Sequence, residues 1–308
     1  MIKKRLEKEK EIPYLYDKVL FKNNTGAEII HYDNASDMIS HCKKSKNQKY
    51  LGNSRDKEWT FGTEFPNIES TTEALINGEC SKSTLKFISN YRDVLLNMDG
   101  IENAMRRADS FKRRRKFSDS GSELDIDRVL SGDPDHWQSM TRGKKDKVVR
   151  LGVNFSVTAG HSEKQLHKLA ALTTVAVDML QRCGLAVEVL ALCVAEGITN
   201  YKKNPFTTYE QGFTFMLKSA NEKLDVSRVA CIGIPGLYRA YGFNNWVNYL
   251  DGKAKSSLGR GMETTQNVKD LLNIKNLIEV KWVKNGAEKA FLSKLLKSVE
   301  QNEILEIN

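Results

Sequence analysis

Three side chains that carry oxygen stand at alternate positions where a strand is predicted to end. They are Asn154, Ser156 and Thr158. Because side chains alternate across a strand, the three point toward one face, and a predicted helix begins shortly after them. Two kinds of chemistry fit this arrangement. The oxygens could coordinate a hard divalent cation, or they could hydrogen-bond the turn and cap the helix.

A run of basic residues flanked by aromatic rings is the second candidate site. Basic side chains neutralise phosphates, and an aromatic ring can stack on a splayed base. Residues 112–123 have the composition of an exposed loop, which suits contact with a nucleic-acid backbone rather than reading of its sequence. The alternatives are a solvated charge run and an arm between subunits. The members of this basic cluster are Arg106, Arg107, Phe111, Lys112, Arg113, Arg114, Arg115, Lys116 and Phe117.

Other combinations of reactive residues give no stronger site. Asp133, Asp135 and His136 lie close together in a segment that contains Gly and Pro, where turn formation explains them better than metal or acid–base chemistry. His161 and His167 do not have the spacing of a metal-binding helix. The sequence has no dinucleotide fingerprint, no Walker pattern and no Gly-x-Ser-x-Gly elbow. The sequence therefore favours a protein that is not an enzyme, and no cofactor is predicted, with Mg²⁺ as the one cation left open.

A strand, a helix and a second strand must position the loop at residue 154. Apolar and β-branched residues predict a strand over 147–156, helical spacing predicts a helix over 163–183, and a second apolar run predicts a strand over 185–194. A right-handed crossover makes the two strands parallel. The predicted fold class is α/β, a mostly parallel sheet flanked by helices, and such folds bind ligands in the loops after their strands. Further strands are predicted over 212–218 and 276–283, and a closing amphipathic helix over 287–299.

The chain divides into two predicted regions. Residues 1–130 form a helical, basic N-terminal region, and residues 131–308 form the α/β domain. Within the first region Ser70 and Glu73 match a capping box, which predicts a short helix with Ser70 as its N-cap. A longer helix is predicted over 81–98.

Charge and cysteine usage limit the partners and the compartment. The net charge of +9 and the pI of about 9.1 favour an acidic partner, of which nucleic acid is the commonest, although a basic surface also serves solubility. The five cysteines form no CxxC pair, so reduced thiols in a cytosolic compartment are predicted. The first ten residues are too charged for a signal peptide, and no run approaches the roughly 20 apolar residues that cross a bilayer. We therefore expect a cytoplasmic protein with no membrane partner.

The strand–loop–helix–strand order over about residues 147–285 resembles the von Willebrand factor A fold. In that family the loop after the first strand carries Asp-x-Ser-x-Ser and coordinates a divalent cation. Here Asn154 stands where the family has aspartate, and Thr158 is a conservative replacement for serine. The resemblance implies a doubly wound α/β fold with a degenerate metal site, because the negative charge that attracts a hard cation is missing.

A broader resemblance, over about residues 68–245, is to a set of uncharacterised bacteriophage-encoded proteins. It rests on the order short helix, Gly-Asp-Pro turn, apolar strand, long helix, Gly and apolar strand, followed by the segment from Ile234 to Arg239. This resemblance implies a phage origin, and hence the cytoplasm of the host cell as the place of action. A phage origin fits a protein that handles nucleic acid during infection.

Three functions follow from these features. The first is a non-enzymatic protein that binds single-stranded DNA or RNA through the basic cluster as a replication or transcription accessory factor, with Tyr238 or Trp246 as further stacking residues. Phage or host polymerase components would be its other partners. The second is an A-domain-like protein-interaction scaffold with a degenerate metal site. The third, a metal-dependent enzyme such as a nuclease, is disfavoured because the strand ends lack clustered carboxylates. The type of nucleic acid and homo-oligomerisation are left open.

Overall fold

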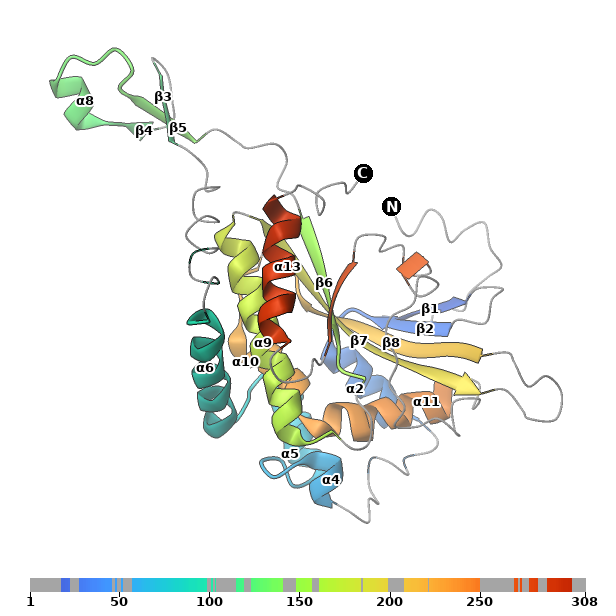
Figure 1. Cartoon of the computed structure of the whole chain (residues 1–308). Coiled ribbons are helices and arrows are strands. Elements are labelled where there is room, and N and C mark those ends of the chain that lie inside the picture. The colour runs from blue at the N-terminus through green and yellow to red at the C-terminus, as the bar shows by residue number, and fades with distance from the viewer. Residues whose placement is uncertain are drawn as a thin grey trace.

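The structure of the protein is a computed structural model of the whole chain (Figure 1). It describes residues 18–22, 28–45, 48, 51, 57–98, 101, 103, 115–118, 123–140, 148–156, 161–183, 185–198, 208–220, 222–249, 269–270, 272, 277–281 and 287–300.

The predicted βαβ unit is present at the centre of the fold. Strand β6 (Val148–Asn154) leads into helix α9 (Glu163–Arg182), which returns the chain to β7 (Ala186–Ile198). The two strands are parallel, as predicted, and β9 (Leu277–Lys281) pairs in parallel with the other edge of β6. Strand β6 is therefore flanked by two parallel neighbours, and the loop that follows it opens at their common carboxyl end.

The main sheet has six strands in the order β1-β2-β8-β7-β6-β9. The predicted third strand is β8 (Thr208–Lys218), which pairs with β7 in the antiparallel sense. Two strands from the N-terminal region complete the sheet: β1 (Lys18–Lys22) is antiparallel to β2 (Glu28–Tyr32), and β2 is parallel to β8. Three of the five pairings are thus parallel, and the region expected to be helical also supplies two strands of the main sheet.

Within the described part of the N-terminal region, four helices pack against the main sheet or against the helices that cover it: α2 (Ala35–Lys43), α4 (Lys57–Phe61), α5 (Ile68–Asn77) and α6 (Lys82–Leu96). The helix predicted after Ser70 begins one turn earlier, because the side chain of Asn67 accepts a hydrogen bond from the Ser70 N–H at 2.8 Å and is the N-cap. The prediction of Ser70 as N-cap is therefore wrong.

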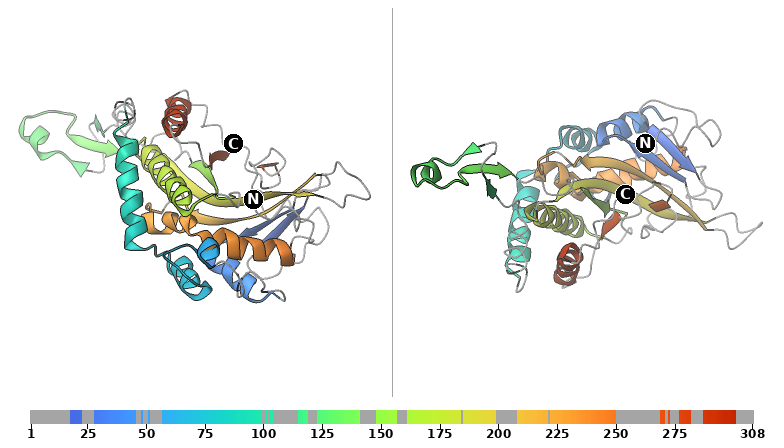
Figure 2. Two further views of the ribbon diagram at one scale, coloured as in Figure 1. Left: turned by 60° about the horizontal axis from the view of Figure 1, so that its bottom comes forward. Right: turned by 90° about the horizontal axis from the view of Figure 1, so that it is seen from above.

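A small antiparallel sheet extends away from the main body (Figures 1 and 2). It pairs β5 (Trp137–Met140) with β3 (Arg115–Ser118) and β4 (Glu123–Leu124), and the short helix α8 (Ile126–Leu130) connects β4 to β5. The exposed loop predicted over 112–123 is therefore wrong for the residues that form β3 and begin β4. The predicted regions meet at residue 130, and this small sheet contains strands from both of them.

The larger of two hydrophobic clusters lies between one face of the main sheet and several helices. Besides α2 and α9, these are the π-helix η2 (Leu237–Gly242), α11 (Phe243–Tyr249) and α13 (Glu288–Glu300). Helix α6 packs against α9 (Figures 1 and 2). The smaller cluster, on the other face, consists of Ile29, Leu190, Leu192, Val194, Leu272 and Leu277.

Tyr238 and Trp246 belong to the larger cluster. Each is only 1% exposed, and their rings lie 5.7 Å apart at a nearly perpendicular angle. Rings so deeply buried cannot stack on a nucleic-acid base, so the idea that they serve as stacking residues is wrong. Among the described residues, no helix combines the length and the apolar character that crossing a bilayer requires.

Candidate functional site

Most of the predicted basic cluster lies outside the described residues, namely Arg106, Arg107, Phe111, Lys112, Arg113 and Arg114. The backbone places Arg115 and Lys116 in β3, opposite Met140 and Ser139 of β5. Phe117 is half-buried, and the guanidinium of Arg128 lies 3.6 Å from the centre of its ring. A base that stacked on this face of Phe117 would have to displace Arg128.

The loop after β6 uses its polar side chains for local hydrogen bonds. The Asn154 side chain accepts from the Ser156 N–H at 3.0 Å and donates to Glu279 Oε1 at 2.6 Å, which ties β6 to β9. Ser156 Oγ accepts from the Val194 N–H of β7 at 2.5 Å. Thr158 lies outside the described residues. Asn154 and Ser156 therefore hold the turn and the neighbouring strands, as the turn-forming alternative predicted, but neither of them caps the helix that follows.

The start of α9 is fixed by other residues. Ser162 is its N-cap, and Gln165 accepts from the Ser162 N–H at 2.7 Å. Glu163 in the first turn accepts from the Thr63 N–H at 3.1 Å. Within the described ranges, no three His, Cys, Asp or Glu side chains converge as metal ligands would.

Replacing Asn154 by aspartate tests how this end of the sheet tolerates the charge that a metal-binding loop would carry. The new carboxylate would face Glu279 where an amide N–H now donates, so we expect Asn154→Asp to lower the free energy of unfolding by about 2 kcal/mol at pH 7. Repulsion raises the pKa of such a carboxyl in the folded state. The destabilisation should therefore shrink as the pH falls and the group is protonated.

Thermal unfolding at several pH values, with and without Mg²⁺, measures this effect. Asn90→Asp is the matched control, because Asn90 is exposed on α6 and should change stability by less than about 0.5 kcal/mol. Equal melting temperatures for the two variants at pH 7 would show that the Asn154–Glu279 hydrogen bond does not contribute to stability.

The acidic turn before β5 has a structural role. Asp133 Oδ2 pairs with Arg128 at 2.8 Å, while its other carboxylate oxygen accepts from the Asp135 N–H at 3.0 Å. His136 Nδ1 lies 2.7 Å from the Asp133 carbonyl. These contacts match the turn predicted from the sequence.

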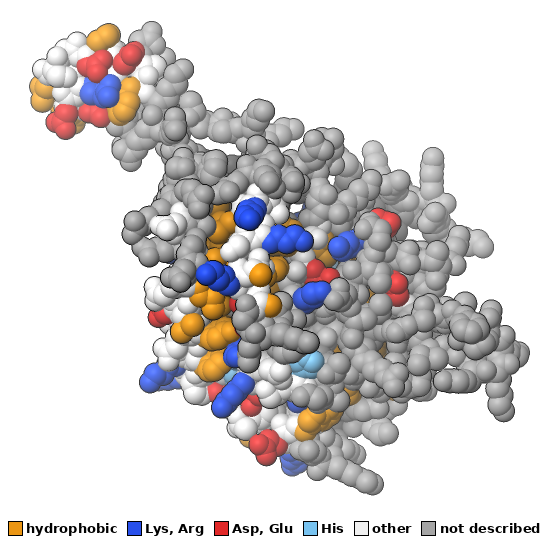
Figure 3. All heavy atoms as spheres, in the orientation of Figure 1, with side chains coloured by type: hydrophobic (Ala, Val, Ile, Leu, Met, Phe, Trp, Pro, Cys, Tyr) orange, Lys and Arg blue, Asp and Glu red, His pale blue; other side chains and the backbone are white. Residues whose placement is uncertain are grey.

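The face formed by α6, α9 and α13 carries an excess of basic side chains (Figure 3). These three helices hold nine Lys and Arg residues against five Asp and Glu residues. Six of the basic residues are exposed lysines, and we call this set the helical lysine face. Its members are Lys82, Lys86, Lys164, Lys289, Lys294 and Lys297.

Several acidic side chains on these helices already have partners. Asp178 pairs with Arg92 at 2.9 Å and with Arg182 at 3.2 Å. Glu288 is buried and accepts from the Tyr91 hydroxyl at 2.6 Å, and burial together with this contact raises the pKa of Tyr91. With Glu163 also engaged by Thr63, three of the five carboxylates form hydrogen bonds or ion pairs with residues other than these lysines.

The spacing of lysines along the helices was a sequence signal for the helical lysine face. A search for runs of consecutive charges does not detect it. Lys82 and Lys86 are four residues apart, and Lys294 and Lys297 are three apart, which places each pair on one side of its helix. Only the packing of α6 and α13 against α9 brings the pairs to a common surface.

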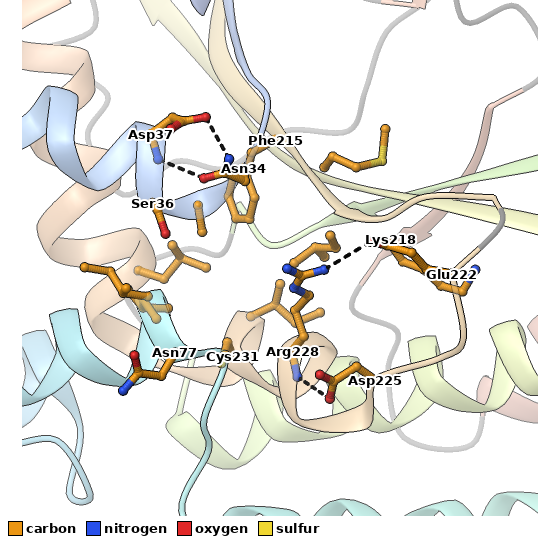
Figure 4. A pocket seen from close by; sticks show the side chains of 18 of the residues that line it. Asn34, Ser36, Asp37, Asn77, Phe215, Lys218, Glu222, Asp225, Arg228 and Cys231 are labelled. Carbon is orange, nitrogen blue, oxygen red and sulfur yellow. Dashed lines mark hydrogen bonds and ion pairs between the residues drawn. The ribbon is translucent and has the colours of Figure 1, made fainter. Parts of the chain in front are cut away.

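A cavity of about 630 Å³ opens between α2, α5, β8 and α10 (Val226–Ala230) (Figure 4). Lys218 on its wall is 2% exposed and donates to the carbonyls of Val187 and Ser219 at 2.7 and 2.8 Å. Burial lowers the pKa of this amine. Because the lining includes both basic and acidic side chains, such as Arg228 and Asp37, the cavity does not select a ligand of one charge.

The fold and the charged surface define an α/β protein with a mixed six-stranded sheet and a lysine-rich helical face. Residues 21–295 match a family described as a domain of unknown function, DUF7192, and the chain belongs to that family. Neither a curated protein nor a solved structure matches the chain.

Proposed function

We propose that this protein binds single-stranded nucleic acid through the helical lysine face, and that the basic cluster at residues 106–117 extends the contact. The observation that carries the proposal is the placement of six exposed lysines on three helices that pack together. Lysine side chains neutralise backbone phosphates without reading bases, so the binding would be sequence-tolerant and sensitive to salt.

The order of the two basic regions along the chain supports a shared role. Helix α6, which carries Lys82 and Lys86 in its first turns, precedes the basic cluster in the sequence, and the cluster ends in β3 with Arg115, Lys116 and Phe117. The net charge of +9 strengthens attraction to a polyanion. Resemblance to bacteriophage-encoded proteins supports a role as a replication or transcription accessory factor during infection.

We also propose that the α/β part of the chain has a fold like that of the von Willebrand factor A family. The parallel order β6-α9-β7, with β9 on the other edge of β6, supports a fold like that of the von Willebrand factor A family with a degenerate loop. In this role the sheet is a scaffold for the outer helices, and the loop after β6 holds the scaffold together.

Removing three lysines of α13 tests the proposal. In the variant Lys289→Ala, Lys294→Ala, Lys297→Ala we expect affinity for a fluorescent single-stranded oligonucleotide to fall roughly tenfold to a hundredfold at low salt. The slope of log affinity against log salt should become shallower by about one for each removed lysine that had neutralised a phosphate, up to about three. Fluorescence anisotropy over a salt series measures both quantities.

The control variant removes the same charge elsewhere. Lys43, Lys57 and Lys223 are exposed but lie outside α6, α9 and α13, so replacing all three by alanine should change affinity by less than about threefold. An Arg113→Ala, Arg114→Ala, Arg115→Ala variant tests the basic cluster separately. Equally weakened binding in the α13 variant and the control would mean that only net charge matters, and unchanged binding in both the α13 variant and the arginine variant would refute the proposal.

A further inference from the structure

Two cysteines that are far apart in the sequence meet at the start of α6. Cys231, in the 3-10 turn η1 (Cys231–Gly233), is 5% exposed, and its Sγ lies 3.8 Å from the carbonyl oxygen of Glu79. That carbonyl belongs to the peptide bond whose nitrogen is that of Cys80. The thiol of Cys231 therefore lies against the backbone of Cys80.

Cys80 is the more accessible of the two and lies at a position that stabilises a thiolate. It is partly exposed and directly precedes Ser81, the N-cap of α6, whose Oγ accepts from the Thr84 N–H at 3.1 Å. The positive end of the helix dipole therefore faces this region. A hydrogen bond from the Cys231 thiol lowers the pKa of Cys80, although burial and the Glu64 carboxylate oppose this effect.

Cys231 has the opposite properties. Its Sγ lies 3.3 Å from the Ser227 carbonyl and 3.7 Å from the Ala74 carbonyl, so several acceptors surround its single S–H and favour the protonated form. Its contact with Cys80 and its burial both raise the pKa of Cys231. A reactive, accessible cysteine beside a buried, protonated one is the arrangement in which an oxidised sulfur is resolved by a second thiol.

We propose that Cys80 and Cys231 form a peroxide-sensitive dithiol, in which Cys80 is oxidised first and Cys231 then closes a disulfide with it. The proposal is independent of nucleic-acid binding, because neither cysteine belongs to the helical lysine face or the basic cluster.

The chemistry balances with hydrogen peroxide as the oxidant. The Cys80 thiolate attacks one peroxide oxygen, the O–O bond breaks, and hydroxide leaves and takes up a proton to become water. Cys80 is then a sulfenic acid. The sulfur of Cys231 attacks the sulfur of Cys80, the S–O bond breaks, and the departing hydroxide takes the thiol proton as a second water. The two sulfurs lose two electrons in total, and the peroxide gains them.

The disulfide would join the start of α6 to the segment between α10 and η2. Cys231 also lines the cavity of Figure 4, close to Asn77 at the end of α5. Oxidation would therefore add a covalent bond between one wall of that cavity and the α5–α6 connection.

Mass spectrometry of the full-length protein tests the proposal. After one equivalent of hydrogen peroxide we expect the intact mass to fall by about 2 Da, from the removal of two hydrogens, and a proteolytic digest without reductant to contain a peptide pair linked through Cys80 and Cys231. Dithiothreitol should reverse both changes. A digest in which Cys80 and Cys231 remain as free thiols, or in which Cys80 is oxidised only to sulfinic acid, would overturn the proposal.

Variants assign the order of the two steps. In Cys231→Ser, whose hydroxyl can still donate to the same carbonyls, Cys80 should accumulate as a sulfenic acid that dimedone labels. In Cys80→Ser, peroxide should leave Cys231 unlabelled. Cys183→Ala is the matched control and should retain the disulfide, since Cys183 is buried at the end of α9. Dimedone labelling of Cys231 rather than Cys80 would contradict the assigned order.

Discussion

Replacing Gly212 by alanine is expected to lower the free energy of unfolding by about 3 kcal/mol or more, one of the largest effects of a single methyl group in this protein. Gly212 lies in β8, between β2 and β7. A Cβ at this position would collide with the backbone carbonyl oxygen of Cys193 and come within 3.1 Å of Val194 Cα. Because both obstacles are backbone atoms of β7, only separation of the two strands can relieve the collision.

Urea denaturation followed by circular dichroism measures this destabilisation. Gly242→Ala is the matched control, because the nearest atoms to its Cβ would belong to the ring of Phe213 at 3.5 Å, an ordinary packing distance, within a helical segment. We expect the control to change stability by less than about 1 kcal/mol. Equal denaturation midpoints for the two variants would show that β7 can move away from β8 at little cost.

Replacing Arg239 by methionine is expected to lower the free energy of unfolding by about 3–5 kcal/mol. Arg239 is 4% exposed, and its two terminal nitrogens donate to the carbonyls of Trp59 and His161. Its guanidinium also lies 4.5 Å from the centre of the Trp59 ring. The residue therefore connects η2 to α4 and to the segment before α9, and methionine would leave two partly buried carbonyls without this donor.

Two further variants separate the role of Arg239 from a general effect of charge. Arg239→Lys keeps the charge, but a single ammonium does not reproduce the fork that reaches both carbonyls, so most of the destabilisation should remain. Arg182→Met removes an exposed arginine paired with Asp178 and should cost less than about 1 kcal/mol. Thermal denaturation of the three variants gives the comparison, and similar melting temperatures for Arg239→Met and Arg182→Met would contradict the assigned role.

Local periodicity was sufficient to predict the β6-α9-β7 unit, because each element carries its own apolar pattern and the crossover rule fixes their direction. The direction of β8 was not predictable in the same way. The predicted strands ended at residue 194 and began at residue 212, a gap that permits either a crossover or a hairpin. In the structure β7 runs to Ile198 and β8 begins at Thr208, and such a short connection suits a hairpin.

The candidate sites likewise differ in whether local sequence or tertiary packing defines them. Asn154 and Ser156 were identified because they are close in sequence and follow a strand. The helical lysine face and the Cys80–Cys231 pair were missed because they depend on which helices meet, which periodicity does not specify. Tyr238 or Trp246 could be predicted as stacking residues because an aromatic side chain suits both a core and a stacking site. Only burial distinguishes the two roles.

The parallel pairing of β2 with β8 has a consequence for the synthesis of this protein. Ile30 of β2 lies opposite Phe213, so a strand made near the start of translation cannot complete its pairing until the ribosome has added about 180 more residues. Until then the edge of β2 that pairs with β8 stays uncovered, and such an unpaired strand edge is a natural target for chaperones. Ribosomal pausing before residue 208 would prolong that vulnerable period.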